Sequence, residues 1–177
     1  KEIAAPLEIS FNITPDRLSD DRFVDQLREQ QAQLDFGPHH LGVEITEQVA
    51  LSSTDEMDKR LQVLRDCGLA LIMDDFGMGH SSLKYLKQFP VSVVKIDGAI
   101  SREVVTNSIC SDIVASITRL CRARNMLSVA EFVENEEQAA LLRELGCDVF
   151  QGYLYSKSLL PSDCLQFIQK RNGGNGA

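Results

Sequence analysis

Six short runs of β-branched and other apolar residues recur along this chain, and longer segments with helical spacing separate them. Strands that alternate with helices pack into a parallel sheet through right-handed crossovers. The pattern therefore predicts an α/β fold. The expected strands cover residues 7–13, 41–46, 69–73, 91–96, 127–130 and 148–150.

The segments between these strands carry apolar residues at the three- and four-residue spacing of a helix that packs on a sheet. Two such faces are Met57, Leu61 and Leu64, and Ile109, Ile113, Ile117 and Leu120. Gly68 and Gly146 each follow a helical segment and precede a strand. Because glycine readily adopts positive φ, we expect the two preceding helices to end there.

A polar residue stands at the end of every expected strand. In a closed α/β barrel all strand C-termini face one mouth, which explains this pattern better than an open doubly wound sheet does. No glycine-rich dinucleotide fingerprint follows the first strand. The sequence thus predicts a TIM-like (β/α) barrel that is incomplete at its N-terminal side, with about six of the eight βα units. The strand-end residues are Asn12, Glu44, Asp74, Asp75, Lys95, Glu131 and Gln151.

Composition limits the partners. The chain has 18 Lys and Arg against 26 Asp and Glu, a net charge of −8, whereas long nucleic acid requires a basic face. No run approaches the roughly 18 apolar residues of a membrane helix, so we expect no membrane contact from this segment. Five cysteines without a CxxC pair are typical of reduced thiols in the cytoplasm. We expect one domain over residues 1–170 and a flexible tail over 171–177.

Asp74 and Asp75 are the strongest chemical signal. Two adjacent carboxylates repel each other where a buried run leaves the core, unless a cation lies between them. Carboxylate oxygens suit Mg²⁺ or Mn²⁺. Helix capping is the alternative role for this pair.

Lys95 lies inside an apolar run, which is costly unless its ammonium meets a carboxylate or a phosphate. The alternative is a lysine that reaches solvent from a strand edge. Glu44 and Glu131 either face solvent or point into the mouth, and Asn12 is either a turn residue or part of the site. Gln151 offers a neutral donor and acceptor for a base edge or a water.

The histidines do not form a metal-binding set, and we expect His39, His40 and His80 to be solvated loop residues. No cysteine lies close to a histidine in a Ser/Cys–His arrangement, so nucleophilic catalysis has no visible basis. An oxygen-rich site with one lysine instead favours metal-assisted hydrolysis, in which two cations bridged by a carboxylate bind a phosphodiester.

Six motifs in order give this chain its resemblance to the bacterial EAL domain, from about residue 7 to residue 161. The resemblance implies a modified α/β barrel and the hydrolysis of cyclic di-GMP to linear pGpG, with Mg²⁺ or Mn²⁺ in a two-metal site. The motifs cover residues 10–12, 44–47, 74–83, 95–97, 130–134 and 151–153.

The resemblance also implies a set of metal ligands. Asn12, Glu44 and Asp74 resemble the ligands of a first metal. Asp74 would bridge to a second metal, with Asp75 and Glu131 on its far side.

Other roles are implied in the same way. Lys95 resembles the lysine that contacts the hydrolytic water, and Glu131 resembles a glutamate that serves as a ligand, a water-orienting group or the base. Asp75 belongs to this catalytic group. Glu47 resembles the glutamate that anchors the glycine-containing loop after Asp75, and Gln151 resembles a substrate-side residue.

Three features depart from the family pattern. The Glu-Ala-Leu signature is absent, and with it one metal ligand, so we expect this segment alone to have impaired activity. Met78 stands where the family usually has Thr. Phe132 stands where it usually has Gly, and its ring either crowds the pocket or packs outside the barrel.

Two functions are weighed. The first is a cyclic di-GMP phosphodiesterase, and the alternative is a catalytically inactive EAL-type domain that acts as a receptor or protein-interaction module. The enzyme is favoured for the parent protein, because a metal site best explains so costly a charge cluster and these family residues are present: Asn12, Glu44, Asp74, Asp75, Lys95 and Glu131. Expected partners are cyclic di-GMP, an upstream sensor or GGDEF domain, and a second copy in a homodimer or swapped assembly through unpaired edges at 7–13 and 148–150.

Overall fold

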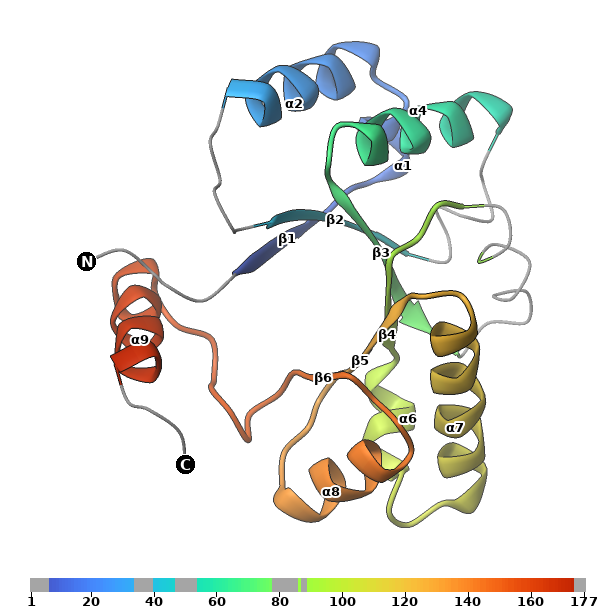
Figure 1. The fold of residues 1–177 in the computed structure, drawn as a ribbon, viewed down its shortest axis with the longest axis vertical. Coiled ribbons are helices and arrows are strands. Elements are labelled where there is room, and N and C mark those ends of the chain that lie inside the picture. Colours follow the sequence, from blue (N-terminus) through green and yellow to red (C-terminus); the bar gives the residue numbers. More distant parts are fainter. Residues whose placement is uncertain (1–6, 34–39, 47–53, 78–85, 87–88, 174–177) are drawn as a thin grey trace.

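Six parallel strands form one curled sheet, with strand order β1-β2-β3-β4-β5-β6, in the computed structural model of this protein (Figure 1). The structure describes residues 7–33, 40–46, 54–77, 86 and 89–173. The prediction of an incomplete barrel with about six parallel strands is confirmed, and β1 and β6 lie at the two edges. The strands are β1 (Glu8–Asn12), β2 (His40–Thr46), β3 (Ala70–Phe76), β4 (Val93–Ile96), β5 (Leu127–Ala130) and β6 (Val149–Phe150).

Helices follow the strands and cover the outer side of the sheet, while the last helix stands apart from the others (Figure 1). They are α1 (Pro15–Leu18), α2 (Asp21–Gln33), α4 (Asp55–Asp66), α6 (Gly98–Glu103), α7 (Ser108–Ala123), α8 (Glu136–Glu144) and α9 (Pro161–Gly173).

The core lies between the sheet and the helices. Val43, Leu71, Val94 and Ala130 are fully buried and come from four adjacent strands. Along each strand, these residues alternate with the ones that face the inside of the curl, as the period-two geometry of a strand requires. Removing this apolar surface from water is the main stabilising contribution to the fold.

Helix ends follow the expected chemistry. The Thr54 side chain caps α4 by accepting a hydrogen bond from Met57 N. Gly68 and Gly146 have φ of 89° and 91° and follow α4 and α8, so both predicted helix ends are confirmed.

Two predictions about individual residues are wrong. Ile109 is 67% exposed, although Ile117 from the same predicted face is buried and Ile113 and Leu120 pack partly buried against the core. The buried side of α7 also includes Cys110, Val114 and Cys121, so it is centred beyond the position of Ile109. His40 begins β2 and is not a loop residue, although it is exposed as expected.

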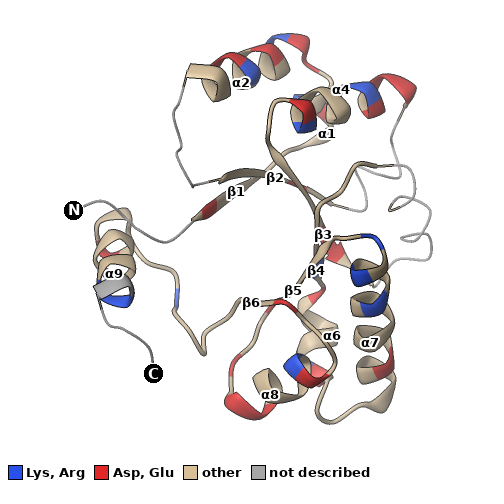
Figure 2. Ribbon diagram, in the orientation of Figure 1, with Lys and Arg blue, Asp and Glu red and all other residues tan. Residues whose placement is uncertain are grey.

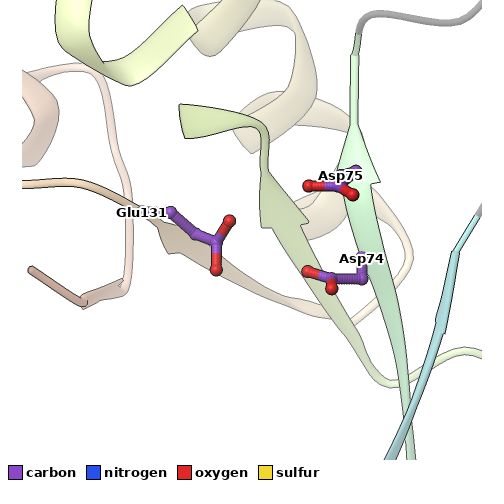
Figure 3. A group of neighbouring side chains, drawn as sticks. All are labelled: Asp74, Asp75 and Glu131. Carbon is purple, nitrogen blue, oxygen red and sulfur yellow. The ribbon is translucent and has the colours of Figure 1, made fainter. Parts of the chain in front are cut away.

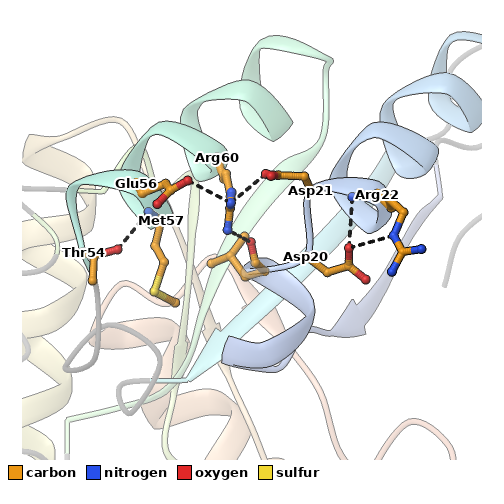
Figure 4. A network of polar contacts seen from close by, with 8 residues as sticks. Asp20, Asp21, Arg22, Thr54, Glu56, Met57 and Arg60 are labelled. Carbon is orange, nitrogen blue, oxygen red and sulfur yellow. Dashed lines mark hydrogen bonds and ion pairs between the residues drawn. The ribbon is translucent and has the colours of Figure 1, made fainter.

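Arg60 joins α4 to the α1–α2 segment (Figure 4). Its guanidinium donates to Leu18 O at 3.1 Å and forms an ion pair with Asp21 at 2.6 Å. A third contact, to Glu56 at 3.1 Å, lies within α4. Because the planar guanidinium satisfies three acceptors at once, it fixes the first two βα units relative to each other.

Charged residues of both signs are interspersed over the helices in Figure 2. Each helix in the part of the chain that the structure describes carries residues of both signs. Within that part, no helix has the length and apolar content needed to cross a membrane. The expected tail begins inside α9, which continues to Gly173, and residues 174–177 lie outside the described ranges.

In the native protein, a thiol reagent is expected to label exposed Cys164 rapidly, and Cys121 and Cys147 only after denaturation. Burial, together with the nearby charge of Asp148, raises the pKa of Cys121 to about 11 and that of Cys147 to about 12, so the reactive thiolate is scarce. Time-resolved labelling with peptide mass spectrometry at mildly alkaline pH measures both rates. Equal native rates for Cys147 and Cys164 would contradict the burial.

Candidate metal centre

The concave face of the half-barrel carries the strand-end residues. Asn12, Glu44, Asp74, Lys95 and Glu131 are in phase with the inward positions of their strands. A hollow of about 270 Å³ opens on this face below them. Its lining is Glu8, Ser10, Ile72, Val93, Lys95, Leu127, Val129, Val149 and Gln151.

A bulge in β3 brings both aspartates to the mouth. In a regular strand Asp74 and Asp75 would point to opposite faces. The register between β3 and β4 shifts between Met73 and Phe76, and Asp75 has a φ of 53°. Bulges of this kind redirect side chains and are common beside functional sites. Asp74 is buried and Asp75 is exposed, but the bulge brings both carboxylates to the same side of the strand end.

Asp74, Asp75 and Glu131 converge between the ends of β3 and β5 (Figure 3). One carboxylate oxygen from each lies within 4.8 Å of those of the other two. Glu131 is 8% exposed and follows β5 directly. Three hard oxygen donors at this separation form a set that could bind a divalent cation.

The Lys95 ammonium lies at the centre of the buried charges. Its Nζ is 2.8 Å from Asp74 Oδ1, 2.8 Å from Glu131 Oε1 and 3.1 Å from Glu44 Oε2. Burial alone would lower the pKa of Lys95, but the contacts with Asp74 and Glu131 outweigh it and raise the pKa. Lys95 therefore stays charged at neutral pH.

One ammonium does not neutralise this site. Burial raises the pKa of Glu131, and nearby Asp74 adds to the effect while Lys95 opposes it. Burial also raises the pKa of Asp75, again with a contribution from Asp74. Four carboxylates, including Glu44, surround a single lysine, so further positive charge would stabilise the ionised site.

Glu44 uses both oxygens inside the sheet. Its Oε1 accepts a hydrogen bond from the Ser10 hydroxyl on β1, and its Oε2 contacts Lys95. Gly42 makes room for this arrangement, because a Cβ there would lie 2.7 Å from Ile72 Cδ1 and 3.3 Å from Ser10 Cβ. Sequence reasoning missed the role of Ser10, although its position two residues before Asn12 places it on the same face.

Two further predicted residues flank the site. Asn12 is the register partner of Glu44 and is exposed. Gln151 follows β6 and lines both the inner hollow and a second hollow of about 190 Å³, which Glu131 and Tyr153 also line. Glu47 and the predicted loop-anchoring contact lie outside the described residues, as do Met78, His39 and His80.

Phe132 packs against α6 and also borders the second hollow. Its ring centroid is 4.1 Å from the Arg102 guanidinium carbon, and a Cβ added to Gly98 would lie 2.1 Å from the ring. The side chain is 45% exposed, and its backbone has a φ of 53°. The ring therefore packs outside the sheet while contributing to the rim of the second hollow.

Gly152→Ala is expected to destabilise the fold by about 1–3 kcal/mol, since the added Cβ would overlap backbone that cannot move freely. That Cβ would lie 2.2 Å from Val133 O and 2.3 Å from Val133 N. Thermal or urea denaturation measures the loss. Gly68→Ala is the control, because it adds the same methyl group with no atom closer than 3.9 Å and costs only the strain of positive φ. If Gly152→Ala lost no more stability than Gly68→Ala, the close approach of Gly152 to the Val133 backbone would be contradicted.

Comparison with known proteins places these features in context. A sequence profile described as the EAL domain matches residues 1–158. The chain is 37% identical over 160 residues to the cyclic di-GMP phosphodiesterase PdeF of Escherichia coli strain K12, covering 90% of this chain and 21% of that protein. It spans about a fifth to a quarter of the length of the first curated relatives it matches.

Solved structures match over most of the chain. The crystal structure of the EAL domain of Mycobacterium smegmatis DcpA has a TM-score of 0.82 and 33% identity, over 91% of this chain and 72% of that one. A manganese and cyclic di-GMP complex of Klebsiella pneumoniae BlrP1 has a TM-score of 0.77 and 31% identity, over 85% and 38%. The prediction of a TIM-like barrel, incomplete here, is thereby confirmed.

Proposed function

This chain belongs to the EAL domain family, and from that premise we propose that its parent domain hydrolyses cyclic di-GMP to linear pGpG with Mg²⁺ or Mn²⁺. The observation that carries the proposal is the convergence of Asp74, Asp75 and Glu131 within 4.8 Å, beside a buried lysine.

The residues present fit a divalent cation. Their donors are carboxylate oxygens, and negative charge exceeds positive charge around them. Asp74 Oδ1 is buried and lies within ion-pair distance of Lys95, but makes no aligned hydrogen bond. Asp74, Asp75 and Glu131 would hold the cations together with Asn12 and Glu44, as in the ligand set that the family resemblance implies. When bound, the cations supply Lewis acidity toward the phosphodiester and lower the pKa of a water.

The chain's own groups do the remaining work. Lys95 holds its ammonium at a fixed point between Asp74 and Glu131, where it orients the attacking water and stabilises negative charge as it develops on the phosphate. Glu131 orients the same water through its carboxylate. Asp75, which is exposed and has a raised pKa, accepts the proton that the water loses.

Gln151 orients the substrate from the side of β6. It lies between the inner hollow and the hollow bordered by Phe132 and Tyr153. An amide that can donate and accept suits the edge of a nucleobase, and exposed aromatic rings suit its face.

Assembly and cellular setting extend this proposal. Leu127 and Val149 are 47% and 43% exposed on the concave face, and β1 and β6 are unpaired on their outer sides within the described sheet. A second copy, paired or swapped through these edges, would cover them. We place the domain in the cytoplasm, downstream of a sensor or GGDEF domain. Sedimentation of this chain tests the assembly, and a monomeric result would exclude it.

The test of function uses the protein as the cell makes it. Cyclic di-GMP is incubated with Mg²⁺, with Mn²⁺ or with EDTA, and pGpG is separated by chromatography. Metal-dependent pGpG formation supports the phosphodiesterase. Tight binding of cyclic di-GMP without turnover under every condition would instead support the receptor.

A further inference from the structure

Gln138 is a polar side chain inside the protein, only 3% exposed, on the first turn of α8. Asn135 caps this helix by accepting a hydrogen bond from Gln138 N at 2.9 Å. A cap residue followed three positions later by Gln is typical of a capping box, in which the glutamine side chain accepts a backbone N–H at the helix start. The simplest role for Gln138 is therefore to cap α8.

Its contacts go beyond a cap. Gln138 Oε1 accepts from Glu134 N at 2.8 Å, a contact at the helix start that lies one residue before the Asn135 cap. Its Nε2 donates to Phe132 O at 3.2 Å and to Ser101 O at 2.6 Å. Both donors of the amide are thus used on backbone outside α8. A capping role needs neither of these two bonds.

The two acceptors, Phe132 O and Ser101 O, belong to the segments that follow Glu131 and Lys95 along the chain. Phe132 comes directly after Glu131, and its positive φ is a conformation that surrounding contacts must hold. Ser101 lies in α6, which begins three residues after Lys95 and is capped by Asp97. Glu131 and Lys95 themselves form an ion pair, with Oε1 and Nζ 2.8 Å apart. Gln138 therefore joins the residue directly after Glu131 to the helix that follows the strand of Lys95.

We propose that Gln138 is a positioning residue that fixes the Glu131 carboxylate at the metal centre through the backbone of Phe132 and Ser101. This inference rests on the proposed function, because it requires that the carboxylate group bind a cation. Groups behind the ligands of a metal site commonly set its affinity by about 10–100-fold.

Two variants separate positioning from capping. Gln138→Glu keeps an acceptor for Glu134 N–H but replaces both donors with a carboxylate facing two carbonyl oxygens. Gln138→Met keeps the size and flexibility of the side chain without its polar groups, and remains informative if the buried charge of Gln138→Glu prevents folding. Leu142→Ala is the matched control, because Leu142 is fully buried on α8 and makes none of these hydrogen bonds.

Mn²⁺ affinity is measured by calorimetry, with the electron paramagnetic resonance spectrum of bound Mn²⁺ and a thermal melt for each variant. Positioning predicts that Gln138→Glu and Gln138→Met both bind Mn²⁺ about tenfold or more weakly, with an altered spectrum. Leu142→Ala should lose thermal stability yet bind Mn²⁺ within about twofold of the wild type, since its loss is a packing cavity.

The outcomes separate the two proposals. If the wild type binds Mn²⁺ and a folded Gln138→Glu or Gln138→Met binds it equally well, the positioning role is wrong while the proposed function stands. Leu142→Ala weakening Mn²⁺ as much as the Gln138 variants would also overturn it, because general destabilisation would then explain the effect. If the wild type itself binds no Mn²⁺, the proposed function fails and this inference falls with it.

Discussion

Asp74→Asn is expected to abolish pGpG formation, with a loss of about a thousandfold or more, and to weaken Mn²⁺ binding. Asp74 is the buried member of the three-carboxylate group and lies 2.8 Å from Lys95. The amide has nearly the same shape but no charge, so it cannot help neutralise two cations. Removing several kcal/mol of charge stabilisation from the transition state corresponds to this loss, at about 1.4 kcal/mol per tenfold.

The control for this variant is Asp163→Asn on α9, which removes one exposed carboxylate far along the chain from the group. Calorimetry with Mn²⁺ and a pGpG assay are run on both proteins. Asp163→Asn should match the wild type in both measurements. Unchanged Mn²⁺ affinity together with normal pGpG production in Asp74→Asn would show that the bridging role is wrong.

The strands and most of the site could be predicted because their signals are local. A strand end is marked by the change from an apolar run to a polar residue. Period-two alternation then places Glu44 and Lys95 on the inward side of their strands. Parallel strands then bring these residues to one mouth without further information. The same logic found Asp74 and Glu131.

What the sequence could not supply depends on contacts between distant segments. The β3 bulge that turns Asp75 toward Asp74 exists only relative to the register of β4. Ser10 and Gln138 act through hydrogen bonds to residues 34 and 37 positions away, Glu44 and Ser101. A serine in a strand and a glutamine in a helix have many ordinary roles, so neither residue type carries a specific signal.

Lys95→Met is expected to destabilise the protein by about 3–5 kcal/mol at neutral pH without metal, because it removes one partner of a buried ion network and leaves the others uncompensated. Asp74, Glu131 and Glu44 all lose their contact with the ammonium. Hydrolysis should also fall sharply, since the group that orients the water is gone. Urea denaturation with and without Mn²⁺ measures the stability.

The pH and metal dependence of this loss identify its cause. Burial already raises the pKa of Glu131 in the wild type, and without Lys95 the opposing effect disappears. A carboxylate whose pKa is higher in the folded than in the unfolded state binds protons more tightly when folded, so stability decreases as pH rises through that range. The loss in Lys95→Met should therefore shrink as the pH falls below neutral.

Mn²⁺ provides the decisive comparison, because a cation among the same carboxylates supplies the positive charge that the variant lacks. Binding to the folded state alone stabilises it, and Mn²⁺ should raise the urea midpoint more in Lys95→Met than in the wild type. Lys59→Met, an exposed lysine on α4, should show neither the large loss nor the larger metal response. An equal loss in Lys95→Met at every pH, unaffected by Mn²⁺, would mean that Lys95 stabilises the fold by packing. The carboxylates around it would then not form a site that binds cations.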